Sequence, residues 1–375
     1  MTTLGIIGGG QLARMLVLQA AELGISCKIL DPKPDAGAGQ LAPQMLADYD
    51  DLSALRQLAD EVAVLTYDFE NVPAPALAEL HLGERLAPGI DVLHVAQDRW
   101  REKQLFRQLN IDVGDFHAVS CRADLLAAIT QTGYPAVLKT RRMGYDGKGQ
   151  MVLREPEDLE RAWQRLGDHA LILEAFIDYQ YECSIIGVRN RAGEVRCYPL
   201  TVNHHEQGIL RASRIGFEPA QERLQQQAAS WLQQIADEFH YVGVLTLELF
   251  VSAGRLLANE IAPRVHNSGH WSIDAADCSQ FENHLRAVTD LPLGPVTISA
   301  EALMINFIGA MPDARNWLQV PGLHWHDYGK QPRALRKVGH ATLCGRDRQQ
   351  LQQRLELLEA VCTAGELPQL ADDMR

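Results

Sequence analysis

Residues 243–270 read GVLTLELFVSAGRLLANEIAPRVHNSGH and are the most informative stretch of the chain. Two apolar runs, 243–251 and 255–262, flank the turn-forming residues Ser252-Ala253-Gly254, a pattern that predicts an antiparallel β-hairpin. Residues 261–271 then bring together arginine, histidine, asparagine and serine side chains. That loop is suited to recognising a polar, anionic substrate.

Each run of the hairpin contains one glutamate among apolar neighbours, Glu248 in the first and Glu260 in the second. A buried carboxylate is costly unless a cation or a donor satisfies it. An odd-length or bulged turn would place the two carboxylates opposite each other, where like charges repel. Mg²⁺ relieves such repulsion, so the hairpin predicts a magnesium site, which Asn259 reaches only if its strand is bulged. Two solvated edge-strand glutamates are the alternative.

A basic segment lies upstream, where a strand expected at 136–139 leads into the loop Gly144-Tyr145-Asp146-Gly147-Lys148-Gly149-Gln150. Its glycines suit a mobile loop that folds over phosphates, with Lys148 at the tip. The segment carries four basic side chains against Asp146, in a chain with a net charge of −13, namely Lys139, Arg141, Arg142 and Lys148. This local reversal of charge predicts an anion site, and a solvated basic hairpin is the alternative. The loop matches neither the Walker nor the protein-kinase motif.

Residues 171–177 read LILEAFI and resemble a strand that enters a linker. Such a segment can offer backbone groups to an adenine edge. Glu182 follows on the next expected strand, where it could accept hydrogen bonds from ribose hydroxyls. An isolated strand glutamate is, however, usually a surface residue.

The N-terminus contains a dinucleotide-like fingerprint, Gly8–Ala13, between a strand expected at 4–8 and a helix at 11–23. Asp31 ends the next strand, at the position of a ribose-binding acid. The alternation of strands and helices predicts a parallel, doubly wound sheet. Alone, the motif predicts a nicotinamide enzyme, or a tight turn that binds no dinucleotide, and the rest of the chain offers no evident hydride-transfer site.

Composition restricts the class of protein further. The length of 375 residues corresponds to two or three domains, at roughly 150 residues each. The acidic excess argues against nucleic-acid polymers and anionic membranes as main partners. The seven scattered cysteines indicate reduced thiols rather than a disulfide framework. No apolar run reaches the ~18 residues of a membrane span, and the N-terminus lacks a signal-peptide pattern, so we expect a cytoplasmic protein.

Six motifs, taken in order, resemble the ATP-grasp superfamily and, within it, the N5-carboxyaminoimidazole ribonucleotide synthetase family of purine biosynthesis. They are Gly8–Leu12, Thr66–Asn71, Gln97-Asp98-Arg99 with Lys103, Gly144–Gln150, Asn259–His270 and Arg336–His340. The resemblance implies an α/β (overall α+β) ATP-grasp fold with a Rossmann-like domain at 1–95, an ATP-grasp domain at 96–295 and a small β-rich domain at 296–375. It also implies a homodimer.

The reaction implied by the family joins 5-aminoimidazole ribonucleotide and bicarbonate at the expense of ATP, through carboxyphosphate. Residues expected to contact ATP are Arg99, Lys139, Gly144, Tyr145, Asp146, Gly147, Lys148, Gly149, Gln150, Glu174, Ala175, Phe176, Ile177, Glu182, His205, Asn259 and Glu260. Mg²⁺ is expected at Glu248, Asn259 and Glu260. The ribonucleotide is expected at Gln11, Arg264, His266, Asn267, Ser268, Lys330, Arg336 and Lys337. Catalytic roles are expected for Lys139, Asp146, Lys148, Arg264 and His266.

Two positions depart from the family pattern: Asp68 stands where the family more often has glutamate, and Ala13 where it more often has glycine. The resemblance also changes the interpretation of the glycine-rich turn, where the substrate's ribose phosphate becomes the expected anion. The alternatives are a formate-using glycinamide ribonucleotide transformylase, a carboxylase subunit, a nicotinamide dehydrogenase and a non-catalytic nucleotide sensor. The proton acceptor in the carboxylation could be the departing phosphate, Asp146 or His266.

Overall fold

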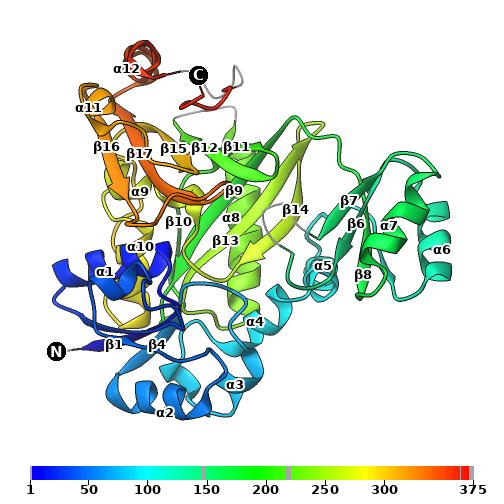
Figure 1. Ribbon diagram of the computed structural model, residues 1–375, viewed down its shortest axis with the longest axis horizontal. Helices are drawn as coiled ribbons and strands as arrows, with labels where there is room; N and C mark the ends of the chain where they lie inside the picture. Colours follow the sequence, from blue (N-terminus) through cyan, green and yellow to red (C-terminus); the bar gives the residue numbers. More distant parts are fainter. Residues whose placement is uncertain (1, 145–148, 217–220, 364, 371–375) are drawn as a thin grey trace.

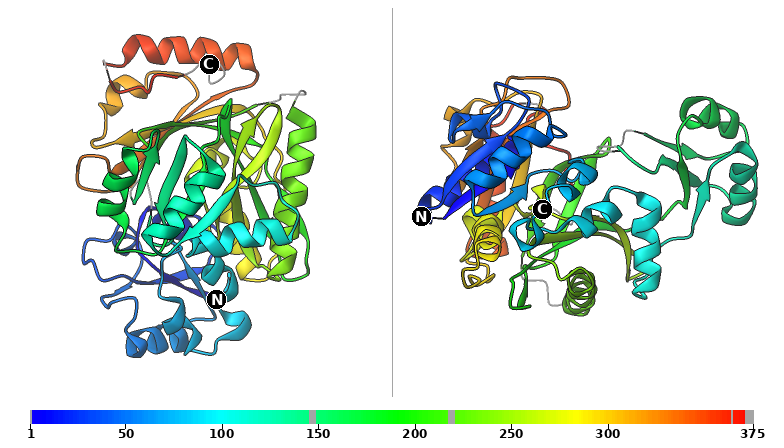
Figure 2. Two further views of the ribbon diagram at one scale, coloured as in Figure 1. Left: turned by 90° about the vertical axis from the view of Figure 1, so that its right-hand side faces the viewer. Right: turned by 90° about the horizontal axis from the view of Figure 1, so that it is seen from below.

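The structure is a computed structural model and describes residues 2–144, 149–216, 221–363 and 365–370. Figure 1 shows an N-terminal lobe, a small lobe that stands apart at its right, and a long sheet between them. The right-hand view in Figure 2 shows the same small lobe standing apart from the rest of the chain. Within the described residues, no helix is long and apolar enough to cross a membrane.

The N-terminal lobe contains a parallel sheet in the order β3-β2-β1-β4. Its elements are β1 (Thr3–Ile7), α1 (Gln11–Glu22), β2 (Ser26–Leu30), β3 (Gln44–Met45), α2 (Leu52–Glu61), β4 (Val64–Tyr67), α3 (Ala74–Ala78) and α4 (Ile90–Ala96). Alternate side chains of β1 enter two cores: Leu4 and Ile6 pack with α1, and Ile7 packs with α2. Because helices cover both faces, the predicted parallel, doubly wound sheet is confirmed.

The small lobe follows α5 (Arg99–Gln108) and consists of a sheet covered on one face by two helices (Figure 1). Its elements are β5 (Phe116–Val119), α6 (Arg122–Thr132), β6 (Ala136–Thr140), β7 (Gln150–Leu153), α7 (Asp158–Leu166) and β8 (Leu171–Ala175), with the strand order β5-β8-β6-β7. Along β6, Ala136 and Leu138 are buried in the core of this lobe, whereas Lys139 lines a cavity. The period of two along the strand thus sends the lysine toward the cavity.

The long sheet runs in the order β14-β13-β9-β11-β12-β15-β17-β16, with β10 beside β9. Its strands are β9 (Tyr181–Arg189), β10 (Val195–Cys197), β11 (Thr201–Glu206), β12 (Ile209–Ile215), β13 (Gly243–Ser252), β14 (Arg255–Ala262), β15 (Glu301–Ile308), β16 (Leu323–Asp327) and β17 (Lys337–Gly345). The helices of this part are α8 (Glu222–Glu238), α9 (Ser272–Ala275), α10 (Gln280–Val288), α11 (Ala314–Trp317) and α12 (Arg348–Val361). Because β12 pairs with β15, strands on both sides of residue 296 form one sheet. The boundaries 1–95, 96–295 and 296–375 stay a prediction.

Candidate active site

A cavity of about 1030 Å³ is lined by residues of the N-terminal lobe, the small lobe and the long sheet. Among the predicted site residues, those lining it are Gln11, Arg99, Lys139, Gly144, Gln150, Glu174, Ala175, Phe176, Ile177, Glu182, His205, Glu248, Asn259, Glu260, Arg264, His266, Asn267 and Lys337. Four predicted residues, Tyr145, Asp146, Gly147 and Lys148, lie outside the described residues. Gly149, Ser268, Lys330 and Arg336 are described but do not line the cavity. The structure therefore brings most of the predicted residues into one place.

Glu248 and Glu260 are direct partners across the hairpin, as predicted, and we call them the carboxylate pair. The predicted cause of this pairing, an odd-length or bulged turn, was wrong, because Ser252 pairs with Arg255 and leaves an ordinary two-residue turn. The register shift lies in β14 instead, where Leu249 pairs with Ala258 and Asn259 is the extra residue of a β-bulge.

Basic side chains contact both carboxylates. His266 Nε2 lies 3.0 Å from Glu248 Oε1, and the Arg99 guanidinium donates to Glu260 Oε2 at 2.9 Å. Burial alone would raise the pKa of Glu248, but the hydrogen bond and charge of His266 lower it overall. A charged glutamate beside a second glutamate and a bulged asparagine is a donor set that fits Mg²⁺.

Two consecutive residues of α5, Glu102 and Lys103, hold the backbone on either side of Glu260, and we call them the α5 clamp. Lys103 Nζ donates to the carbonyl oxygen of Asn259 at 2.6 Å. The N–H of Ile261 donates to Glu102 Oε1 at 2.7 Å. Both clamp side chains are buried, with 2% and 3% of their residues' surfaces exposed. The clamp thus fixes the bulge that aligns the carboxylate pair.

Glu102 is a sensitive probe of this arrangement. Burial raises its pKa from 4.5 to about 8, against the opposing effect of Lys103. Because this folded-state value lies above the unfolded one, the stability that it contributes is complete below pH 4.5 and is lost as the pH rises through 8.

Glu102→Gln keeps an oxygen that can accept from Ile261 but removes the titration. Urea unfolding of both proteins across this range should show the variant gaining relative stability by up to about 1.4 kcal/mol per pH unit. Glu102→Ala, which loses the acceptor as well, should be less stable than the glutamine variant throughout. A difference between wild type and Glu102→Gln that stays constant with pH would contradict this assignment.

Glu174 lies between two lysines rather than facing the cavity alone. Its Oε2 accepts from Lys139 Nζ at 2.9 Å and lies 3.6 Å from Lys103 Nζ. Burial would raise the pKa of Glu174, but the charges of Lys103 and Lys139 lower it to about 2. One carboxylate oxygen is engaged in this way, and the adenine contact expected of the backbone at 174–177 stays a prediction.

The substrate loop, residues 264–270, is held by buried polar contacts. Arg264 Nε donates to Glu70 Oε2 at 2.5 Å. The second ring nitrogen of His266 lies 2.8 Å from Ser268 Oγ, which in turn contacts Ser184 Oγ at 2.7 Å. Ser268 is fully buried, so it supports His266 from behind.

Asn267 is also fixed from behind by a reciprocal amide pair with Asn306. Each side-chain amide donates to the other's oxygen, at 3.1 and 2.7 Å. Asn267 is 6% exposed but still lines the cavity.

The glycine-rich turn is filled by the chain's own carboxylates. Asp31 accepts from the Gly9 N–H at 2.7 Å and from the Tyr49 hydroxyl at 2.7 Å. Asp68 accepts from the Gly10 N–H at 2.7 Å. Because these bonds use the groups that would bind a dinucleotide, the turn does not support the nicotinamide alternative.

We call Lys337, which lines the cavity, and Lys330, which bonds to the lining residue Gln11, the basic edge. Lys330 Nζ donates to Gln11 Oε1 at 2.6 Å, and burial lowers the pKa of Lys330 to about 8. Lys337 lines the cavity, whereas Arg336 points to the carbonyl of Gln331 at the exposed surface.

Sequence reasoning assigned no role to the α5 clamp or to Glu70. Lys103 and Glu70 do occur in the family motifs, which was the available signal. No sequence signal pointed to Glu102, because a helical glutamate beside a lysine is typical of a solvated face.

Comparisons with known proteins identify the family of the chain. Family models match residues 1–97 (ribonucleotide synthetase preATP-grasp domain), 104–281 (ATP-grasp domain) and 302–354 (phosphoribosylaminoimidazole carboxylase C-terminal domain). A protein of Pseudomonas aeruginosa named N5-carboxyaminoimidazole ribonucleotide synthase is 49% identical over 361 residues, covering 96% of this chain and 99% of that protein.

Two solved structures extend the comparison. The synthetase from Thermus thermophilus superposes with a TM-score of 0.93 at 44% identity, covering 98% of this chain and 100% of that chain. The synthase from Aspergillus clavatus, in complex with ADP and 5-aminoimidazole ribonucleotide, superposes with a TM-score of 0.88 at 28% identity. The match covers 96% of this chain and 98% of that chain. The chain therefore belongs to the N5-carboxyaminoimidazole ribonucleotide synthetase family of ATP-grasp ligases.

Proposed function

We propose that this protein carboxylates 5-aminoimidazole ribonucleotide with bicarbonate and ATP, giving N5-carboxyaminoimidazole ribonucleotide, ADP and phosphate. The observation that carries the proposal is the carboxylate pair, set by a bulge beside Lys139 and the substrate loop in one cavity. In the first step a bicarbonate oxygen attacks the γ-phosphorus of ATP, the bond to ADP breaks, and carboxyphosphate forms. The exocyclic amine then takes the carboxyl group as phosphate and one proton leave.

ATP and Mg²⁺ fit the charge of the cavity. Glu248, Asn259 and Glu260 would hold Mg²⁺, which supplies positive charge to phosphate oxygens. Lys139 would neutralise charge on the transferred phosphoryl group, and Arg99, which Glu260 holds at 2.9 Å, adds a second positive charge to the cavity. Lys148 would assist as the loop 144–150 excludes water from the reactive intermediate.

The ribonucleotide would lie between the substrate loop and the basic edge. Arg264, Asn267, Lys337 and Gln11 all line the cavity and would contact the ribonucleotide. Both ring nitrogens of His266 are engaged, one with Glu248 and the other with Ser268, so the imidazole has no free nitrogen with which to act as a base. The departing phosphate or Asp146 is then the better proton acceptor.

Coupled turnover tests the proposal. ADP release should require both bicarbonate and the ribonucleotide, and formate should not replace bicarbonate. ADP formed at an equal rate without the ribonucleotide would contradict carboxylation of that substrate. Turnover with formate and glycinamide ribonucleotide would indicate the transformylase alternative.

Arg264→Ala should raise the KM for the ribonucleotide at least tenfold, on the order of one charge-assisted hydrogen bond, while the KM for ATP changes little. Glu70→Gln is the matched control, because it removes the charge of the side chain that accepts from Arg264 and leaves the guanidinium in place. Initial-rate kinetics with each substrate varied in turn measures both. A change confined to the KM for ATP would contradict the assignment.

The proposal includes four further points, which rest on the family resemblance and on the composition of the chain. The enzyme is expected to be a homodimer and cytoplasmic, with small molecules rather than nucleic acid or membrane as its partners. Its domains are expected to divide near residues 95 and 295. Sedimentation or light scattering measures the first of these.

A further inference from the structure

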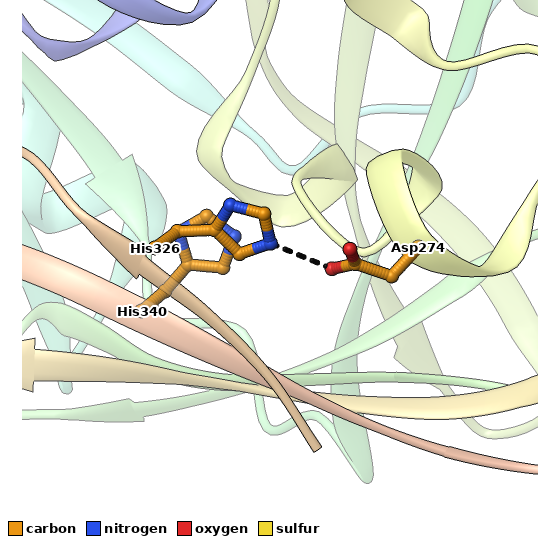
Figure 3. Close-up of side chains that lie close together, drawn as sticks. All are labelled: Asp274, His326 and His340. Carbon is orange, nitrogen blue, oxygen red and sulfur yellow. Dashed lines mark hydrogen bonds and ion pairs between the residues drawn. The ribbon is translucent and has the colours of Figure 1, made fainter. Parts of the chain in front are cut away.

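A cluster of histidines with one aspartate lies outside the cavity, behind the substrate loop. It comprises Asp274 on α9, His326 on β16 and His340 on β17, which Figure 3 shows, together with His324 on β16, and we call it the histidine cluster. Asp274, His326 and His340 each offer one ligand atom, and these atoms lie within 4.8 Å of one another. The mechanism proposed above uses none of these side chains.

The strand register explains why the imidazoles meet. His326 and His340 are direct partners between β16 and β17, and their rings stack with centroids 4.3 Å apart and an interplanar angle of 11°. Figure 3 shows the two rings overlapping, with Asp274 reaching toward them from the helix. His326 Nε2 lies 2.9 Å from Asp274 Oδ2. His324, two residues earlier on the same face of the strand, brings Nδ1 to 3.6 Å from Asp274 Oδ1.

His340 shows that the cluster is not satisfied by protein alone. It is fully buried, and its Nδ1 shares a hydrogen bond of 2.8 Å with the hydroxyl of Tyr328. Its Nε2 is buried and has no hydrogen-bond partner within the described part of the chain. A buried polar atom without a partner is costly, and a proton held on Nδ1 by Tyr328 leaves the Nε2 lone pair free to bind a cation.

We propose that the histidine cluster is a binding site for a divalent transition metal of the zinc type, with Asp274, His326 and His340 as ligands and His324 as the fourth donor. Imidazole nitrogens with one carboxylate suit Zn²⁺ and are poor ligands for Mg²⁺. In a tetrahedral zinc site neighbouring ligand atoms are about 3.3 Å apart, so these side chains need to draw in by roughly 1.5 Å. The His324 side chain is 47% exposed, which gives an ion a path from solvent to the buried carboxylate of Asp274.

The position of the histidine cluster suggests what a bound metal would do in the folded protein. α9 follows the substrate loop directly, and β17 begins at Lys337, which lines the cavity. A metal bound to α9, β16 and β17 would therefore cross-link the two elements that flank the ribonucleotide. This role adds to the proposed function, but the binding itself can be tested without any turnover.

The test uses Co²⁺ as a visible probe on chelator-treated protein in excess Mg²⁺, which occupies the carboxylate pair. One equivalent of Co²⁺ should bind and give the ligand-field bands typical of a low coordination number. Zn²⁺ should displace the Co²⁺. His326→Ala and Asp274→Asn should each weaken binding more than 100-fold, whereas Tyr328→Phe, which removes an outer partner, should weaken it about 10–100-fold. His169→Ala, an exposed histidine elsewhere, is the matched control.

Asp274→Asn keeps the shape of the side chain, and His326 is partly exposed, so circular dichroism should show both variants folded. Equal Co²⁺ binding by wild type, His326→Ala and Asp274→Asn would overturn the proposal and leave a structural histidine–aspartate pair. A thiolate charge-transfer band would overturn it as well, because it would place the ion on cysteine. Failure of carboxylation with intact Co²⁺ binding would count against the proposed function alone.

Discussion

Glu260→Gln is expected to lower kcat on the order of 10²-fold or more. Glu260 is one half of the carboxylate pair, and its Oε2 is the acceptor for Arg99. Glutamine keeps the shape but loses the charge, so the proposed Mg²⁺ would be held by Glu248 and Asn259 alone. Arg99 would also lose the partner that orients it.

The measurement is steady-state ADP release at several Mg²⁺ concentrations. A metal ligand predicts that high Mg²⁺ restores part of the rate of Glu260→Gln, because the defect is then partly one of affinity. Glu238→Gln, at an exposed position on α8, is the matched control and should behave as wild type. A kcat close to the wild-type value at ordinary Mg²⁺ would remove Glu260 from the proposed metal site.

The carboxylate pair could be predicted from sequence because its signal is local. A glutamate within an apolar strand is conspicuous, and the short turn at 252–254 limits the register to a few choices. The bulge could not be located in the same way. It depends on Lys103 and Glu102, which are more than 150 residues away in sequence and meet β14 only in the folded protein.

Strands β11 and β12 were not predicted, and the reason is physical. Their sequence, TVNHHE followed by ILRASRI, lacks the apolar alternation of a half-buried strand. The polar residues are buried because they satisfy one another. Asn203 donates to Ser184 Oγ at 3.0 Å and accepts from Ser213 Oγ at 2.8 Å. Patterning rules treat such residues as solvent-facing, whereas here they support the substrate loop through Ser184.

Asp31 shows how a correct motif gave a wrong chemical expectation. The fingerprint at Gly8–Ala13 lies in a parallel sheet with helices on both faces, as the sequence predicted. Its acid is bound by Gly9, Lys33 and Tyr49 of the same lobe. Spacing alone reports the backbone fold, while the occupant of the turn depends on contacts that sequence spacing does not contain.

Lys103→Met should lower kcat/KM for ATP by about 100-fold, as expected when one hydrogen bond and one buried ion pair of a charged group are lost. Lys103 Nζ donates a hydrogen bond to the carbonyl of Asn259 and forms an ion pair with the carboxylate of Glu174. Methionine fills nearly the same buried volume, so the loss is electrostatic and not a cavity. Lys28→Met, which breaks an exposed pair with Glu61, is the control and should change little.

The dependence on Mg²⁺ separates a positioning role of Lys103 from a purely structural one. If Lys103 holds the bulge in register, the Mg²⁺ concentration for half-maximal rate should rise in Lys103→Met, because Glu260 no longer stays opposite Glu248. Glu102→Gln, which keeps its bond to Ile261, should leave that concentration unchanged. A variant that unfolds more easily but has the wild-type Mg²⁺ dependence would show that the α5 clamp supports the fold without aligning the carboxylate pair.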